Sequence, residues 1–219
     1  MPARQVFSGP VCLDTAFNPT MIKKRGKDKK GDVCPFWAGY LLLCPLRNLV
    51  HNPEKILRPY VKEGMRVLDL GAAMGFFSLP LARMVGPGGK VVSVDVQGRM
   101  TESLKRRAQK AGLLNIIEPR TCNNTSLGID DLSGEIDFAL AFAVVHEVTD
   151  VSAFFSEVYR TLKDNGELLF AEPKGHVPSK KFERSVDIAV EEGFKIIARP
   201  RIFRSKAVLF KKKGESFTS

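Results

Sequence analysis

The sequence predicts an α/β fold, a doubly wound and mostly parallel sheet with helices on both faces. Short apolar runs that look like strands alternate with amphipathic helical segments between residues 65 and 171. This alternation is typical of a parallel sheet whose crossover helices bury both faces. The last two strand-like runs, 194–199 and 207–211, have no helix between them. They predict an antiparallel hairpin at the C-terminal edge of the sheet.

Each expected element has a local signal. Asn52 before Pro53 predicts a capped helix start, and Asp150 predicts another cap. Glycines at 86–89 and at 112 predict helix ends. Strands are expected at 65–70, 90–96, 115–120, 135–142, 167–171, 194–199 and 207–211. Helices are expected from 53, over 76–84, 99–111 and 151–162, and from 179, with a turn at 164–166.

Composition fits one domain with an N-terminal extension. The chain has 219 residues, of which 44% are hydrophobic, enough for a core. We expect an N-terminal arm and lid helix over 1–52, the main domain over 53–213 and a tail over 214–219. No apolar run reaches membrane-spanning length and no signal peptide is evident, so a cytoplasmic protein is expected. Nothing in the sequence indicates an oligomeric state.

The formal net charge is +10, and much of the excess lies at 23–30 and 211–213. Our interpretation is a solvated loop and a chain end. The alternative is attraction to a polyanion. No aromatic residues interleave with the basic run at 23–30, which argues against nucleic acid as the partner.

The strongest local signal is a glycine loop between a strand and a helix. A strand delivers the chain to Gly71, and a helix begins near Gly75. Glycine lets the backbone turn and approach a ligand closely, and the helix start directs N–H groups at it. A dinucleotide loop would read G-x-G-x-x-G. Here Ala73 replaces the second glycine, and Phe76 and Phe77 would crowd a pyrophosphate.

An acidic residue ends the next strand. Asp95 stands 24 residues after Gly71, where a carboxylate can accept hydrogen bonds from both hydroxyls of a ribose. The alternative role of Asp95 is to cap the following helix. The position after a glycine loop favours the ribose role.

The run Leu68-Asp69-Leu70-Gly71-x-x-x-Gly75, followed by Val94-Asp95-Val96, resembles class I S-adenosylmethionine-dependent methyltransferases. It is most similar to the small-molecule branch with ubiquinone/menaquinone-type and arsenite-type enzymes, over about residues 53–211. The resemblance implies a Rossmann-like fold, S-adenosylmethionine as cofactor, S-adenosylhomocysteine as product, and a small-molecule acceptor. The alternatives are an RNA or protein acceptor, a non-catalytic cofactor-binding module, and a nicotinamide-dependent oxidoreductase.

The resemblance also implies positions for the cofactor. The loop 71–75 would wrap the methionine part, Asp95 would hold the ribose, and Val96 and Met100 would flank the adenine. Asn123 would accept a hydrogen bond from the adenine amino group through its carbonyl oxygen. The full set implied at the cofactor is Asp69, Gly71, Ala72, Ala73, Gly75, Phe76, Phe77, Asp95, Val96, Met100, Cys122, Asn123, Asn124, Ala141 and Phe142.

Candidate bases follow two later strands. His146 and Glu147 come after the fourth strand and Glu172 ends the fifth, where ligands of open α/β sheets bind. Histidine can act as a general base near neutral pH. The alternative is that His146 orders the loop and Glu147 starts a turn.

Residues for the acceptor are expected in the N-terminal segment. Trp37, Tyr40 and His51 would form a lid that works with His146, or would pack against the sheet as core.

The four cysteines are Cys12, Cys34, Cys44 and Cys122. None stands in a C-x-x-C spacing, so we expect free thiols and no metal site. A minority hypothesis is that Cys34, Cys44 and Cys122 hold a soft metalloid such as arsenite.

Overall fold

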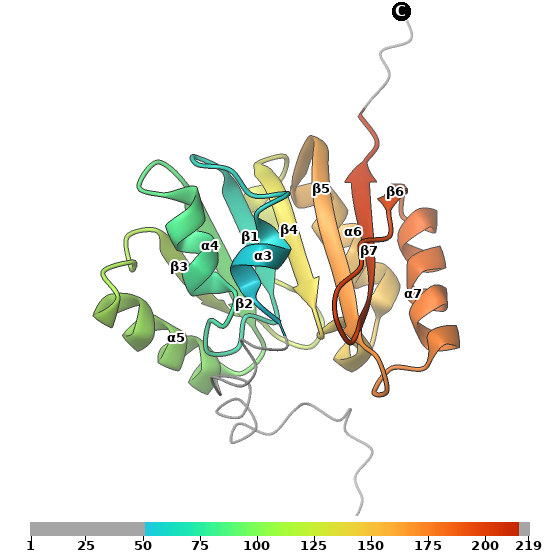
Figure 1. Ribbon diagram of the computed structural model, residues 1–219, viewed down its shortest axis with the longest axis horizontal. Coiled ribbons are helices and arrows are strands. Elements are labelled where there is room, and N and C mark those ends of the chain that lie inside the picture. The colour runs from blue at the N-terminus through green and yellow to red at the C-terminus, as the bar shows by residue number, and fades with distance from the viewer. Residues whose placement is uncertain (1–50, 215–219) are drawn as a thin grey trace, which may run out of the picture. The chain divides into compact units, whose positions relative to one another are not determined.

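The computed structural model describes residues 51–214 of the chain. They form a seven-stranded sheet in the order β3-β2-β1-β4-β5-β7-β6 (Figure 1). The strands are β1 (Arg66–Leu70), β2 (Lys90–Asp95), β3 (Ile117–Thr121), β4 (Ile136–Phe142), β5 (Leu162–Pro173), β6 (Phe194–Ala198) and β7 (Ser205–Lys212). The helices are α3 (Pro53–Leu57), α4 (Ser78–Val85), α5 (Gly98–Lys110), α6 (Val151–Thr161) and α7 (Ser179–Glu191), with 3-10 turns η1 (Asp130–Leu132) and η2 (Val145–Glu147).

Strand directions confirm the predicted mixed sheet. Strands β1 to β5 pair in parallel, and β7 pairs antiparallel with both β5 and β6. Because no helix joins β6 to β7, the chain reverses within the sheet instead of crossing over it. Strand β7 therefore lies inside the sheet and β6 forms its edge.

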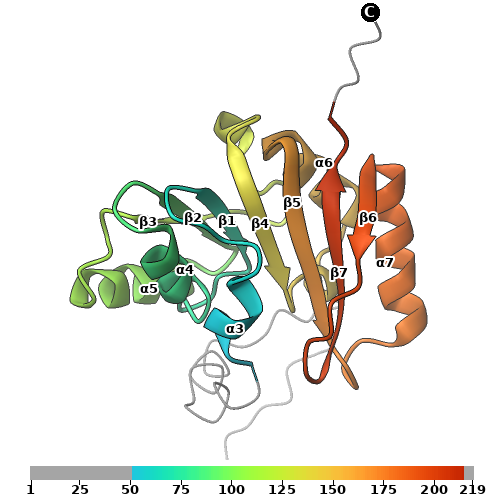
Figure 2. The ribbon, with the colours of Figure 1, turned by 45° about the horizontal axis from the view of Figure 1, so that its top comes forward.

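Helices cover both faces of the sheet. Helices α3, α4 and α5 pack on one face and α6 and α7 on the other (Figures 1 and 2). Alternation along each strand supplies both cores, since successive side chains point to opposite faces. In β1, for example, Val67 packs with Leu81 of α4, whereas Leu68 joins the cluster that contains Phe155 of α6.

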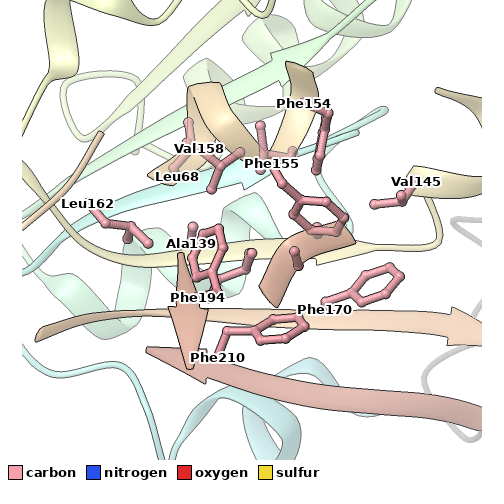
Figure 3. Packing of buried hydrophobic residues seen from close by; sticks show 14 of the residues in the cluster. Leu68, Ala139, Val145, Phe154, Phe155, Val158, Leu162, Phe170, Phe194 and Phe210 are labelled. Carbon is pink, nitrogen blue, oxygen red and sulfur yellow. The ribbon is translucent and has the colours of Figure 1, made fainter. Parts of the chain in front are cut away.

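The core beneath α6 and α7 is rich in phenylalanine (Figure 3). The Phe155 ring lies 5.4–6.3 Å, centroid to centroid, from those of Phe154, Phe170, Phe194 and Phe210. Phe154 is the neighbour of Phe155 in α6, whereas the other three rings come from strands β5, β6 and β7. Three of the four contacts therefore join segments distant in sequence. This cluster fixes α6 against β5 and β7, and so fixes the strand ends described below.

Two predicted helix caps are confirmed. The side-chain oxygen of Asn52 accepts a hydrogen bond from the Lys55 N–H at 3.0 Å, with Pro53 at the first helical position. The Asp150 carboxylate accepts one from the Ala153 N–H at 2.9 Å.

The predicted turn at 164–166 is instead a bulge within β5. Ile136 of β4 pairs with Leu162, and the next pair is Phe138 with Glu167. The surplus residues loop out of the ladder, and Asn165 adopts a φ of +63°, a conformation that asparagine tolerates. The turn-forming sequence is therefore used to absorb a register shift, and β5 begins five residues earlier than predicted.

The carboxyl ends of β1, β2, β4 and β5 lie at one edge of the sheet, the lower edge in Figure 1. The loop between β6 and β7 reaches the same edge because β7 runs in the opposite direction. No helix within residues 51–214 is long and apolar enough to cross a membrane.

Candidate active site

The glycine loop is fastened to the neighbouring strand. The N–H groups of Gly71 and Ala72 donate to the Val94 carbonyl of β2 at 2.9 and 3.0 Å. The Arg107 guanidinium of α5 donates to the Met74 carbonyl from the other side. No side chain caps the start of α4. These contacts hold the loop in a fixed bend.

The bend requires residues without bulk. A Cβ on Gly71 would lie 2.7 Å from the Val144 side chain, and one on Gly75 would lie 2.6 Å from the Leu79 side chain. Both glycines have positive φ, +71° and +84°. Ala73, the departure from the glycine pattern, also has a positive φ of +47°. The loop keeps a glycine-like conformation there at a cost to an alanine backbone.

Asp95 is tied to this loop. Its carboxylate accepts the Ala73 N–H at 2.9 Å and the Gln97 N–H at 2.8 Å, one on each oxygen. The two hydrogen bonds lower the pKa of Asp95, but burial raises it by more. Asp95 thus contacts the loop and Gln97, the residue before α5, without capping that helix. Its oxygens each retain further accepting capacity, and the ribose role stays a prediction.

A second acid lies beneath the loop. Asp69 of β1 is buried and accepts the Ser78 hydroxyl of α4 at 2.6 Å. Burial raises the pKa of Asp69 to about 7, with a smaller contribution from the charge of Asp95. Asp69 thus joins β1 to the first residue of α4 and is a support for the loop.

The residues predicted to contact the adenine differ in exposure. Met100 is buried on α5, and Val96 is half-buried after β2. The Asn123 carbonyl oxygen is engaged locally, because it accepts the Thr125 N–H, the Thr125 hydroxyl and the Ser126 N–H at 2.7–2.9 Å. Asn123 and Asn124 are exposed. The Asn123 oxygen therefore shapes its own loop, a role that the sequence did not predict.

The candidate bases after β4 and β5 come together. Glu172 is 1% exposed. One of its oxygens accepts a hydrogen bond from the backbone N–H of His146 at 3.0 Å. The other oxygen lies 2.8 Å from the ring nitrogen Nδ1 of His146. Adjacent parallel strands β4 and β5 bring these residues to one edge, although 26 positions separate them. The Glu172 carboxylate therefore holds both the backbone and the ring of His146.

The surroundings tune His146. Burial lowers the pKa of its imidazole, but the hydrogen bond and charge of Glu172, with the charge of Glu147, raise that pKa above the ordinary value. Nε2 of His146 lies 3.8 Å from a Glu147 oxygen. The His176 ring meets the His146 ring edge-on at 4.8 Å. The Lys181 ammonium of α7 donates to the His146 carbonyl at 3.0 Å.

Aromatic residues flank the exit of β4. The rings of Phe142 and Phe77 lie 4.8 Å apart, and Phe76 meets Phe77 at 5.0 Å. His51 packs edge-on against Phe142 at 5.2 Å, and its Nε2 lies 2.9 Å from the Phe203 carbonyl. His51 is therefore placed at this edge, where sequence predicted an acceptor contact. Ala141, also predicted here, is buried in β4.

Several predictions fall on residues outside 51–214, namely Trp37, Tyr40, Cys12, Cys34 and Cys44, and the arm, lid and tail boundaries stay predictions. Cys122 is half-buried, and burial raises the pKa of its thiol to about 11. The three-cysteine hypothesis stays a prediction, because Cys34 and Cys44 lie outside the described residues. Within residues 51–214, no group of three or more His, Cys, Asp or Glu side chains is arranged so that it could hold a metal ion.

Sequence reasoning missed four residues of this edge: Ser78, Arg107, Val144 and Lys181. Each acts through a contact with a partner distant in sequence or through a backbone group, so no local pattern reveals it. The Glu172–His146 contact had one usable signal, since both residues end neighbouring strands of the predicted sheet.

The sheet order and the two helical layers define a Rossmann-like α/β domain. A family model described as "Methyltransferase domain" matches residues 61–201. The chain belongs to this methyltransferase-domain family.

Individual relatives agree with the family. A ubiquinone/menaquinone biosynthesis C-methyltransferase of Haemophilus ducreyi is 31% identical over 51% of this chain and 42% of its own length. An arsenite methyltransferase of Aquipseudomonas alcaligenes is 27% identical over 69% of this chain and 47% of its own length. The chain thus spans less than half of either relative.

Among solved structures, a SAM dependent methyltransferase from Aquifex aeolicus superposes with a TM-score of 0.73 at 25% identity, covering 81% of this chain and 98% of that one. These comparisons confirm the predicted fold and the predicted family, and the Aquifex neighbour is named for its dependence on S-adenosylmethionine.

Proposed function

We propose that this chain transfers a methyl group from S-adenosylmethionine to a small-molecule acceptor. The observation that carries the proposal is the bend at 71–75, held against β2 and joined through Ala73 to the Asp95 carboxylate. A tight bend with glycine at both ends, beside an acidic strand end, suits a ligand with a ribose and a backbone-like amino-acid part.

The cofactor would lie along this edge. Loop 71–75 would hold its methionine part, and the Asp95 oxygens would accept from its ribose hydroxyls. Met100 and Val96 would provide apolar contact for the adenine. The remaining predicted contacts, including Cys122 and Asn124, belong to the same proposal. When bound, the cofactor supplies a methyl group already activated by a positively charged sulfur.

His146 would hold and move a proton. In the neutral ring, the Glu172 carboxylate favours a proton on Nδ1, because that nitrogen lies 2.8 Å from Glu172 Oε2. Nε2 then keeps its lone pair and can accept a proton from an acceptor hydroxyl or carbon. Glu172 positions the ring in this scheme, and Glu147 adds negative charge near Nε2. The aromatic residues around Phe142 would exclude water.

The acceptor is proposed to be small because the two relatives described above are named for small molecules. Those names are a C-methyltransferase of ubiquinone/menaquinone biosynthesis and an arsenite methyltransferase. The alternatives of an RNA or protein acceptor, and of a module that binds cofactor without turnover, make different predictions. Binding to RNA would weaken steeply with salt, and a module would bind cofactor and transfer nothing.

Calorimetric titration of the full chain with S-adenosylhomocysteine tests the cofactor part of the proposal. We expect a dissociation constant in the micromolar class, which corresponds to a binding free energy of about −8 kcal/mol. A screen for methyl transfer over metabolite, metalloid and RNA pools then tests the acceptor. Transfer to small molecules supports the proposal, whereas transfer to RNA alone, or binding without any transfer, contradicts it.

A further inference from the structure

A basic hollow lies beside the candidate bases and has no role in the site described so far. It has a volume of about 780 Å³ and opens between the β6–β7 loop, the segment after β5 and the start of α7. Both Figure 1 and Figure 2 place these loops at the sheet edge that carries the candidate site. The Lys174 N–H donates to the Arg204 carbonyl at 2.8 Å and joins the two loops directly.

The charge of this hollow is strongly one-sided. Five cationic residues line it and one acidic residue does. Two of the cations are already engaged: Arg199 with both oxygens of Glu183 at 2.8–3.0 Å, and Lys206 with the Val177 carbonyl at 2.6 Å. The others are Lys174, Arg201 and Arg204, and no described residue forms an ion pair or side-chain hydrogen bond with them.

An exposed aromatic residue, Phe203, lies between the two unpaired arginines in the sequence. Phe203 is 68% exposed, the most exposed large apolar residue among those described. Ile202 beside it is buried and anchors the loop. A guanidinium fork matches the oxygens of a carboxylate or phosphate, and an aromatic face suits an apolar or planar group. The loop therefore carries two complementary recognition elements within residues 201–204.

The hollow is also close to the candidate bases. Lys174 comes two residues after Glu172, the carboxylate that holds His146. The Phe203 carbonyl lies 2.9 Å from His51 Nε2, and His51 packs on Phe142 at the exit of β4. A molecule seated in the hollow would extend toward the edge where the methyl group is expected. Its volume is within the range of small-ligand sites.

We infer that the β6–β7 loop binds the acceptor, and that the acceptor is a small molecule with an oxyanion group attached to an apolar or planar body. The oxyanion lies against Arg201 and Arg204, and the body lies against Phe203. This inference rests on the proposed function and narrows its substrate class. The oxyanion is a carboxylate or a phosphate, and the experiment separates the two.

The test is calorimetric titration of the full chain with three probes of similar size: phenyl phosphate, phenylacetate and neutral benzyl alcohol. We expect one or both anions to bind and the neutral probe not to bind. Salt should weaken the binding, since exposed charges are screened within about 10 Å at 0.1 M. The Arg201→Ala/Arg204→Ala variant should lose about tenfold or more in affinity, and Phe203→Ala should lose less.

The matched control removes the same charge elsewhere. Lys105→Ala/Lys110→Ala on α5, both exposed, should bind the anions as the parent does. S-adenosylhomocysteine is titrated into every variant, and its affinity should not change. Failure of that titration in the parent would contradict the proposed function itself. Normal cofactor binding with no anion binding, or an equal loss in the α5 control, would overturn this inference alone.

An oligonucleotide arm separates a small acceptor from a polymer. A single-stranded homopolymer that binds through Arg201 and Arg204, while phenyl phosphate does not bind, would also overturn the inference. The inference is supported if phenyl phosphate or phenylacetate still binds when the homopolymer is present as a competitor.

Discussion

At the scale of single residues, one carboxylate governs the candidate base. Glu172 is buried and uses both oxygens on His146, at 3.0 and 2.8 Å. Without it, burial would dominate and would lower the pKa of the His146 imidazole. The two residues therefore behave as a pair, with Glu172 setting the pH at which His146 can take a proton.

Glu172→Gln should lower the pKa of His146, because it removes the negative charge and keeps the shape. NMR titration of the His146 ring measures this directly, without an acceptor. In the parent the midpoint should lie above 6.5, and the variant should titrate at lower pH. Glu147→Gln, which alters the more distant oxygen at 3.8 Å, should shift the midpoint less. Identical midpoints in the parent and Glu172→Gln would contradict the pairing.

Ala73 is the residue where the loop departs from glycine. It has a φ of +47°, which costs an L-residue about 1–2 kcal/mol relative to glycine. Ala73→Gly should therefore raise the free energy of unfolding by about 1 kcal/mol, measured by urea denaturation. Gly75→Ala is the opposing control, since its Cβ would meet Leu79 and Leu104 and should destabilise. Destabilisation by Ala73→Gly would show that the loop conformation is different.

At the scale of elements, helix α6 holds the strand ends through its phenylalanines. Phe155 is fully buried and contacts rings from β5, β7 and the start of β6 (Figure 3). Those strands carry Glu172 and the basic loop. The packing of α6 thus supports the strands that position Glu172 and the β6–β7 loop.

Phe155→Ala should cost about 3–5 kcal/mol of unfolding free energy, because it leaves a cavity in a close-packed cluster. Val190→Ala on α7, which is 45% exposed, should change stability by less than about 0.5 kcal/mol. Denaturant unfolding of both variants measures the difference. Similar, small effects for the two would contradict the packing described here.

Sequence patterns predicted the elements well because their signals are local. Caps at Asn52 and Asp150, alternation in the strands and the missing helix before β7 all act within a few residues. The bulge in β5 was missed because the turn-forming residues 164–166 have a second use that depends on the β4 register. The engaged oxygen of Asn123 was missed for a related reason, since its partners are backbone groups of its own loop.

Contacts between segments distant in the sequence limit how much of the site the sequence can predict. The sequence named His146 and Glu172 separately, and strand order joined them. It could not name the basic hollow, because Lys174 and Arg204 become neighbours only when β7 inserts between β5 and β6. Long-range pairing of this kind leaves no periodic signal.

At the scale of the whole molecule, the buried acid under the loop should make stability depend on pH. The pKa of Asp69 rises from 3.8 to about 7 on folding, so between these values the folded state binds more protons than the unfolded state. Stability from this group is full below about pH 4 and is lost as pH rises to about 7. The slope is at most about 1.4 kcal/mol for each pH unit.

Asp69→Asn should remove the loss of stability that occurs as the pH rises from about 4 to about 7. Unfolding free energies measured from pH 4 to 8 should fall less steeply in Asp69→Asn than in the parent. Asp187→Asn, at an exposed position of α7, should leave the slope as in the parent. A parent and an Asp69→Asn variant with parallel pH profiles would refute the burial effect.

The central claim is that the bend at 71–75 and Asp95 together hold a nucleoside cofactor. Titration of S-adenosylhomocysteine into the parent, Asp95→Asn and Asp95→Ala tests it most directly, with Asp187→Ala as the matched loss of an exposed carboxylate. We predict parent-like affinity for Asp187→Ala, a weaker complex for Asp95→Asn, and a loss of about tenfold or more for Asp95→Ala. Equal affinity in the parent and Asp95→Ala would contradict the claim.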